Sequence, residues 1–258
     1  YTYLHLAPDP EQTRDLVDSG AVCVAYETVT SPHGGLPLLA PMSKVAGRLA
    51  IQAGAHSLEQ PNGGLGMLLG GAPGVPPAKV TIIGGGVVGT HAAHIAVGMG
   101  ADVWVLDRNP DVIESHWRQF GRSTTAVYST QDALEEHVIS SELVIGGVLI
   151  PGAEAPKLVT REMLKKMQPG SVIVDVAIDQ GGCFETSKPT THADPTYVVE
   201  DVVHYCVANM PGAVPKTSTY ALNNVTLTHA LALADKGYKQ ALKDDVHLRA
   251  GLNVIHGK

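Results

Sequence analysis

The stretch VTIIGGGVVG, residues 80–89, joins a short apolar run to a glycine-rich turn. It fits the pattern G-x-G-x-x-G through Gly84, Gly86 and Gly89, and the small residues after it favour a helix. Gly84 permits a tight turn, Gly86 lets the backbone approach a pyrophosphate, and Gly89 lets the helix pack closely on its strand. A pyrophosphate bound there faces the unpaired N–H groups and the positive end of the helix dipole. The stretch therefore predicts a strand–turn–helix unit that binds a dinucleotide, with a glycine-rich turn that holds no ligand as the alternative.

A carboxylate after the second apolar run supports the dinucleotide. Residues 103–106 are followed by Asp107, about 20 residues past the glycines, where an acid accepts hydrogen bonds from the adenosine ribose. The same charge repels a 2′-phosphate, so NAD is favoured over NADP, although the neighbouring Arg108 weakens that preference. Methyltransferases also combine a glycine turn with an acid after the second strand, which leaves S-adenosylmethionine open.

Short apolar runs alternate with helical patterns beyond Lys79. Fully apolar strands separated by helices predict a parallel sheet covered on both faces, an α/β doubly wound fold of the Rossmann type. The predicted strands are 80–83, 103–106, 125–128, 143–145 and 172–176, extended near Tyr197 and over 202–207, and the predicted helices are 87–99, 110–120, 131–138 and 160–167. Before this region we expect a helix over 10–19, a strand over 21–25, a boundary loop over 31–41, a helix over 42–59 capped by Ser43, and irregular structure over 60–78. After it, residues 215–242 are expected to form a helix outside the sheet.

The composition is that of a folded chain with a sizeable core. Of the 258 residues, 44% are hydrophobic and 17% are charged, which excludes a disordered tail or a coiled coil. Lys and Arg number 18 against 25 Asp and Glu, and the net charge of −7 argues against a nucleic-acid partner. No stretch reaches the ~18 uninterrupted apolar residues that span a bilayer, so no membrane association is predicted.

The cysteine and histidine patterns predict no metal site. Cys23, Cys183 and Cys206 are odd in number and widely spaced, so each is expected to be a small buried residue rather than part of a disulfide or zinc framework. His91 and His94 share a helical spacing but lack a carboxylate partner. A reducing cytoplasm is the predicted compartment.

Two further positions have chemical potential but an ambiguous pattern. The stretch VDVAIDQGG, residues 174–182, places Asp175 and Asp179 at the carboxyl end of a predicted strand, where open α/β sheets bind ligands. A turn carboxylate that bonds to local backbone is an equal reading of Asp179. His5 lies in a strand-like stretch, residues 1–6, which by itself favours a structural role.

Taken together, these residues resemble the family that alanine dehydrogenase shares with the NAD(H)-binding component of proton-translocating transhydrogenase. The matching stretches are 1–8, 37–43, 70–77, 83–89, 172–183 and 209–218, in order along the whole chain. Residues 177–182, AIDQGG, resemble the dehydrogenase branch because they keep an acid at the catalytic position. A non-catalytic NAD(H)-binding subunit is the alternative.

The resemblance implies NAD-dependent, reversible oxidative deamination of L-alanine to pyruvate and ammonia by a homo-oligomer, a hexamer. It implies that His5 is the catalytic histidine and Asp179 the catalytic carboxylate. With the glycine motif, the predicted cofactor site comprises Ser43, Gly84, Gly86, Val87, Val88, Gly89, Asp107, Ser129, Val148, Leu149, Val176, Ala177, Ile178, Asp179, Asn209 and Met210. A different small 2-amino acid or 2-oxo acid as substrate stays open.

The resemblance also predicts the domains. Residues 41–210 are expected to be the NAD-binding domain, and residues 1–40 with the return segment 211–258 an incomplete second α/β domain for the substrate. Family members begin well before Tyr1, and that segment carries an Arg and a Lys that hold the substrate carboxylate. We therefore expect these 258 residues alone to bind NADH yet to oxidise alanine poorly.

Overall fold

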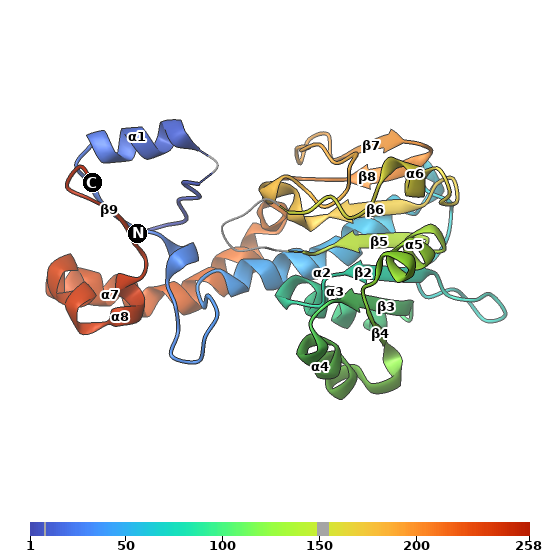
Figure 1. Cartoon of the computed structure of the whole chain (residues 1–258), viewed down its shortest axis with the longest axis horizontal. Coiled ribbons are helices and arrows are strands. Elements are labelled where there is room, and N and C mark those ends of the chain that lie inside the picture. The colour runs from blue at the N-terminus through green and yellow to red at the C-terminus, as the bar shows by residue number, and fades with distance from the viewer. Residues whose placement is uncertain (8, 149–154) are drawn as a thin grey trace. The chain divides into compact units, whose positions relative to one another are not determined.

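The computed structural model describes residues 1–7, 9–148 and 155–258. The chain folds into two compact units, one formed by residues 1–43 and 214–258 and the other by residues 44–213 (Figure 1). The first crossing between the units lies within α2 (Ala40–Ser57), and the second lies just before α7 (Pro215–Asp244).

A seven-stranded sheet forms the centre of the larger unit, with the strand order β4-β3-β2-β5-β6-β8-β7. Every neighbouring pair is parallel except β7 with β8. The strands are β2 (Lys79–Ile83), β3 (Asp102–Asp107), β4 (Thr125–Tyr128), β5 (Leu143–Gly146), β6 (Val172–Asp175), β7 (Thr196–Val199) and β8 (Val202–Tyr205). Counted from β2, the parallel strands follow the 3-2-1-4-5-6 order of a Rossmann sheet, which confirms the predicted fold class.

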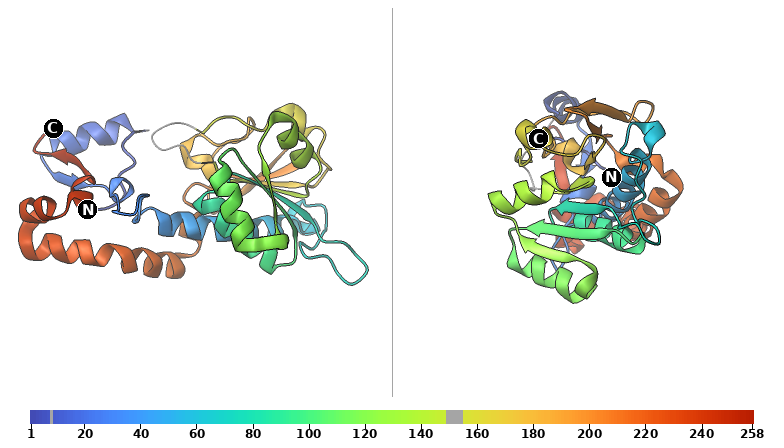
Figure 2. Two further views of the ribbon diagram at one scale, coloured as in Figure 1. Left: turned by 60° about the horizontal axis from the view of Figure 1, so that its bottom comes forward. Right: turned by 90° about the vertical axis from the view of Figure 1, so that its right-hand side faces the viewer.

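Helices cover both faces of this sheet (Figure 2). On one face Ile83, Val144 and Ile173 belong to a buried cluster with residues of α5 (Gln131–Ile139) and α6 (Arg161–Leu164). Because side chains alternate along a strand, the neighbouring residues point the other way. There a Cβ on Gly89 of α3 (Val87–Gly98) would lie 3.2 Å from Ile82, and a Cβ on Gly54 of α2 would lie 2.6 Å from Leu143. The remaining crossover helix, α4 (Pro110–Phe120), packs against β3 and β4.

The smaller unit has a two-stranded antiparallel sheet of β1 (Val22–Val24) and β9 (Leu252–Ile255). Its helices are α1 (Pro10–Asp18), α7 and α8 (Val246–Arg249). Asp9 caps α1 by accepting from the Gln12 N–H at 2.9 Å. A buried cluster that includes Val24, Leu242 and Leu248 joins β1 to the end of α7 and to α8.

Most predicted elements are confirmed within a residue or two, and the exceptions have local causes. Ser43 does not cap α2, because the N–H groups of Ala40 and Ser43 already donate to Leu36 and Leu39 in helical fashion. The helix predicted over 160–167 ends at Leu164, ahead of the turn at Pro169. Residues 1–6 form only an isolated bridge, between Thr2 and Ala25, and the region predicted to be irregular opens with the 3-10 turn Gln60–Asn62.

Candidate functional site

The predicted cofactor residues of the larger unit follow the carboxyl ends of parallel strands. Since β2, β3, β4, β5, β6 and β8 all run the same way, these ends share one edge of the sheet. Open α/β sheets bind ligands at this edge, where the strand order reverses. Here the reversal lies between β2 and β5. The residues that follow these ends include Gly84 to Gly89 after β2, Asp107 at the end of β3, Ser129 after β4, Val148 after β5, Val176 to Asp179 after β6, and Asn209 and Met210 after β8.

The glycine turn has the geometry that its motif predicts. Gly84 adopts a left-handed φ of +94°, which other residues rarely adopt. A Cβ on Gly89 would lie 1.9 Å from the Gly84 carbonyl oxygen, so α3 can approach β2 only without a side chain there. A Cβ on Gly86 would meet nothing within 4 Å. Gly86 begins α3 without a side-chain cap, which leaves space and N–H groups for an anion.

Asp107 is tied to this turn through its carboxylate. Its Oδ2 accepts from the Gly85 N–H at 2.7 Å, and its Oδ1 accepts from the Asn109 N–H at 2.8 Å. The side chain is half-buried. Since a carboxylate has about four acceptor positions, two bonds leave capacity for ribose hydroxyls.

A buried histidine that the sequence analysis missed, His116, forms a hydrogen bond with the backbone of the glycine turn. The carbonyl of Gly85 accepts from the His116 Nε2–H at 2.8 Å and from the Thr90 hydroxyl at 3.0 Å. His116 is 1% exposed, and its other ring nitrogen, Nδ1, is buried without a hydrogen-bond partner. His116 lies 31 residues from Gly85 in the sequence, so no local sequence pattern predicts this contact.

Four residues converge at the reversal of strand order. A Cβ on Gly84 would lie 3.0 Å from the Gly147 carbonyl oxygen and 3.2 Å from Val148, and a Cβ on Gly147 would lie 3.2 Å from Val88. The Gly147 N–H also donates to the Ile83 carbonyl at 2.9 Å. Predicted residues Val88 and Val148 are therefore neighbours of the glycine turn, and Leu149 lies outside the described residues.

Asp179 and Asp175 have different surroundings although they lie four residues apart. Asp179 is exposed in a 3-10 turn, Val176–Gln180, whose Ala177 and Ile178 are buried. Asp175 is 0% exposed and accepts from backbone and hydroxyl donors. Burial raises the pKa of the Asp175 carboxyl, and hydrogen bonds from Ser187 and Cys183 act in the opposite direction. The sequence placed both acids at this strand end but did not distinguish a buried acid from an exposed one.

Asn209, Met210 and Ser129, three further predicted cofactor residues, differ in their exposure to solvent. Asn209 is exposed with a left-handed φ of +55°, and its carbonyl accepts from the Gly212 N–H at 2.9 Å. Met210 is buried, at 3% exposure. Ser129 is 9% exposed, and its N–H donates to the Asp107 carbonyl at 2.9 Å. Ser129 is thereby held beside the end of β3.

His5 and Ser43 belong to the smaller unit. His5 is exposed with a left-handed φ of +49°, and its N–H donates to Glu27 Oε1 at 2.6 Å. Its ring stacks on Tyr3 with centroids 5.6 Å apart. The Tyr3 hydroxyl donates to the Leu38 carbonyl at 2.7 Å, and burial, aided by the negative charge of Glu27, raises the pKa of Tyr3. Both neighbours of His5 are thus fixed within the unit; Glu27 is a second residue that the sequence analysis missed.

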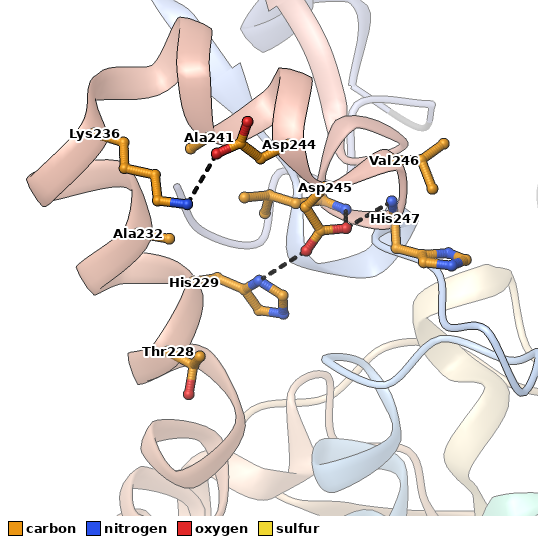
Figure 3. A pocket seen from close by; sticks show the side chains of 10 residues that line it. Thr228, His229, Ala232, Lys236, Ala241, Asp244, Asp245, Val246 and His247 are labelled. Carbon is orange, nitrogen blue, oxygen red and sulfur yellow. Dashed lines mark hydrogen bonds and ion pairs between the residues drawn. The ribbon is translucent and has the colours of Figure 1, made fainter.

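A cavity of about 440 Å³ lies elsewhere in the smaller unit, between α7 and α8 (Figure 3). Its polar side chains are paired with one another: Lys236 with Asp244 at 2.9 Å, and His229 with Asp245 at 3.8 Å. Asp245 also caps α8 by accepting from the N–H groups of His247 and Leu248. These contacts stabilise the local fold, and we assign no ligand to the cavity.

The described residues were also considered as metal ligands, membrane spans and disulfide partners. Residues 1–7, 9–148 and 155–258 contain no cluster of three or more His, Cys, Asp or Glu that could hold a metal ion. No helix in this part of the chain is long and apolar enough to cross a membrane. Cys23, Cys183 and Cys206 are all buried and free, as predicted.

Comparison with known families decides the class of protein. Residues 50–258 match the family model described as "Alanine dehydrogenase/PNT, C-terminal domain", and residues 1–46 match the N-terminal domain of the same family. The chain belongs to the alanine dehydrogenase/PNT family. This membership excludes the methyltransferase alternative and supports an oxidoreductase role.

Individual members of the alanine dehydrogenase/PNT family are close in sequence. The chain is 65% identical to "Alanine dehydrogenase" of Halomonas elongata over 258 residues, which are 100% of this chain and 70% of the relative. It is 57% identical to "Alanine dehydrogenase 2" of Staphylococcus aureus strain USA300, over 100% of this chain and 69% of the relative.

Solved structures of the alanine dehydrogenase/PNT family agree with the fold. An L-alanine dehydrogenase superposes with a TM-score of 0.95 and 52% identity, over 99% of this chain and 71% of its own. A transhydrogenase from Sinorhizobium meliloti superposes with a TM-score of 0.79 and 26% identity, over 98% of this chain and 72% of its own. The match is weaker on the transhydrogenase side.

Proposed function

We propose that this protein catalyses the reversible, NAD-dependent oxidative deamination of L-alanine to pyruvate and ammonia. The observation that carries the proposal is the cradle at the carboxyl end of β2. There, Gly86 leaves open space at the start of α3, and the Asp107 carboxylate is fixed beside it by Gly85. The high identity to proteins named alanine dehydrogenase supports L-alanine as the substrate.

The residues at the sheet edge fit a dinucleotide. The open start of α3 suits a pyrophosphate, because its N–H groups and dipole favour an anion. Asp107 suits the adenosine ribose and disfavours a 2′-phosphate, which supports NAD over NADP. The other proposed cofactor residues of the larger unit are Val87, Val88, Ser129, Val148, Val176, Ala177, Ile178, Asn209 and Met210. When bound, the nicotinamide accepts the hydride from the substrate Cα.

His5 and Asp179 are proposed to handle protons and to orient the substrate. The ordinary pKa of histidine, about 6.5, suits proton exchange near neutral pH. Glu27 holds the His5 backbone and Tyr3 stacks on its ring, so the imidazole has a restricted position. Asp179 is exposed on a short turn whose Ala177 and Ile178 are buried, and this arrangement presents the Asp179 carboxylate to a ligand. Ser43 is also proposed as a cofactor residue, on the family resemblance alone.

We propose domain roles and an assembly on the same basis. The larger unit is proposed as the NAD-binding domain and the smaller one as part of the substrate domain. A homo-oligomer, a hexamer by family resemblance, is supported by exposed Tyr220, Leu227 and Leu231, whose spacing places them on one face of α7. Three free cysteines support a reducing cytoplasm. Light scattering of the purified protein tests the assembly directly.

The test of function is a binding and turnover experiment on the full-length protein without any partner. NADH and NADPH are titrated by fluorescence, and a panel of small 2-amino acids is offered with NAD⁺ while NADH absorbance is followed. We expect NADH to bind more tightly than NADPH, and L-alanine to give the fastest rise in absorbance. Tight NADH binding with no turnover of any amino acid would instead support a non-catalytic subunit, the role favoured by the likeness to transhydrogenase.

A further inference from the structure

The turn that carries Asp179 is closed by the buried carboxylate of Asp175. Asp175 Oδ1 accepts from the Ala177 N–H at 3.0 Å, at the beginning of the turn. Its Oδ2 accepts from the Cys183 N–H at 2.9 Å, beyond the end of the turn, and from the Ser187 hydroxyl. One side chain therefore joins the two ends of the segment 176–182, with Asp179 between them.

The backbone of this segment is shaped to admit that carboxylate. Gly181 and Gly182 have left-handed φ angles of +88° and +78°. A Cβ on Gly182 would lie 2.5 Å from Asp175 Oδ2. The N–H groups of Gly181 and Gly182 donate back to Ile178 and Ala177, each at 3.0 Å. The turn is thus a closed loop around Asp175, and Lys157 supports it by donating to the carbonyls of Gly181 and Gly182.

The donor set matches an ionised carboxylate. Two N–H groups, the Ser187 hydroxyl and, at 3.7 Å, the Cys183 thiol donate to the two oxygens, and no donor is needed from this side chain. Such charge-assisted bonds are roughly twice as strong as neutral ones. An asparagine in this place would direct an N–H toward the donors that face one of the two oxygens, and part of the closure would be lost.

We propose that Asp175 is a positioning residue for the reaction, acting with Ser187 to hold the turn that presents Asp179. This proposal rests on the proposed function, because it assumes that Asp179 is the catalytic carboxylate. Asp175 itself is fully buried and is not expected to touch substrate or cofactor. Its effect reaches the reaction through the orientation of Asp179, to which rates are sensitive.

The experiment compares neighbouring variants in the full-length protein. Ser187→Ala removes one donor to Asp175 and keeps the carboxylate, while Asp175→Asn changes the carboxylate itself. Thr186→Val is the matched control, since Thr186 is also half-buried but bonds His204 Nε2, at 2.7 Å, instead of Asp175. Alanine kcat and KM, NADH affinity and Tm are measured for each variant.

Ser187→Ala is expected to lower kcat about tenfold with NADH affinity within twofold of the parent, and Thr186→Val to keep kcat within twofold. In an Asp179→Asn background, Ser187→Ala is expected to cause no further loss, because both changes act on one group. Equal losses in Ser187→Ala and Thr186→Val, or an undiminished loss in the Asp179→Asn background, would overturn the positioning role. Full activity of Asp179→Asn alone would instead remove the catalytic role of Asp179, and this proposal with it.

Discussion

The position of Gly89 leaves no room for any side chain. A Cβ there would lie 1.9 Å from the Gly84 carbonyl oxygen, which is backbone and cannot move aside cheaply. Gly89→Ala is therefore expected to push α3 off β2 and to weaken NADH binding by about tenfold or more, with a lower Tm. Gly98→Ala, in the same helix, is the control, because a Cβ there meets nothing within 4 Å. Equal NADH affinity in the two variants would contradict the packing argument.

The proposed catalytic role of His5 can be tested by one substitution. His5→Asn removes the imidazole but suits the left-handed backbone at this position, since asparagine tolerates positive φ better than alanine does. Its N–H can still donate to Glu27. In the full-length protein, alanine kcat is expected to fall about 10²–10⁴-fold with NADH binding retained. His33→Asn, in an exposed loop, serves as the control. A His5→Asn enzyme within twofold of the parent rules out the catalytic assignment.

At the scale of elements, local pattern predicted the larger unit well. The strands β2, β3, β4 and β5 are apolar runs, and their helices begin where the pattern changes, so each could be located from adjacent residues. The end of α6 and the start of α2 differ from the prediction because backbone hydrogen bonds outside the helical pattern determine them. Ahead of Ser43, for example, the carbonyls of Leu36 and Leu39 accept the first helical hydrogen bonds. The same contrast applies to the site. The glycine motif and Asp107 have a fixed spacing, but the support from His116 and Gly147 depends on contacts between distant segments.

The long helix α7 is interrupted at Gly237. The sequence predicted one helix over 215–242, but Gly237 has φ +73° and ψ +154° inside it, a conformation that essentially only glycine adopts. Gly237→Ala is therefore expected to lower the free energy of unfolding by about 1–3 kcal/mol, measured by urea unfolding. Asp235→Ala, an exposed change two residues earlier, is expected to stay within about 0.5 kcal/mol of the parent. An equally stable Gly237→Ala protein would show that α7 can run straight.

At the scale of the whole molecule, a buried histidine makes stability depend on pH. His204 is 0% exposed, and burial lowers its pKa from 6.5 to about 4. Its Nδ1–H donates to the Val202 carbonyl at 2.8 Å, and its Nε2 accepts from Thr186 at 2.7 Å. This arrangement satisfies both nitrogens of the neutral ring, with Nδ1–H as a donor and Nε2 as an acceptor. The unfolded chain binds that proton near pH 6.5 and the folded chain only near pH 4.

The stability contributed by the neutral ring is therefore full above pH 6.5 and is lost as the pH falls toward 4. In that window the unfolded state binds more protons, so the free energy of unfolding falls by up to about 1.4 kcal/mol per pH unit from this one group. Urea unfolding of the parent and of His204→Gln between pH 7 and pH 4 isolates the contribution, because all other titrating groups are shared. The variant is expected to be less stable at pH 7 and to show the shallower loss on acidification. Parallel curves for the two proteins across this range would show that His204 is not held neutral by the fold.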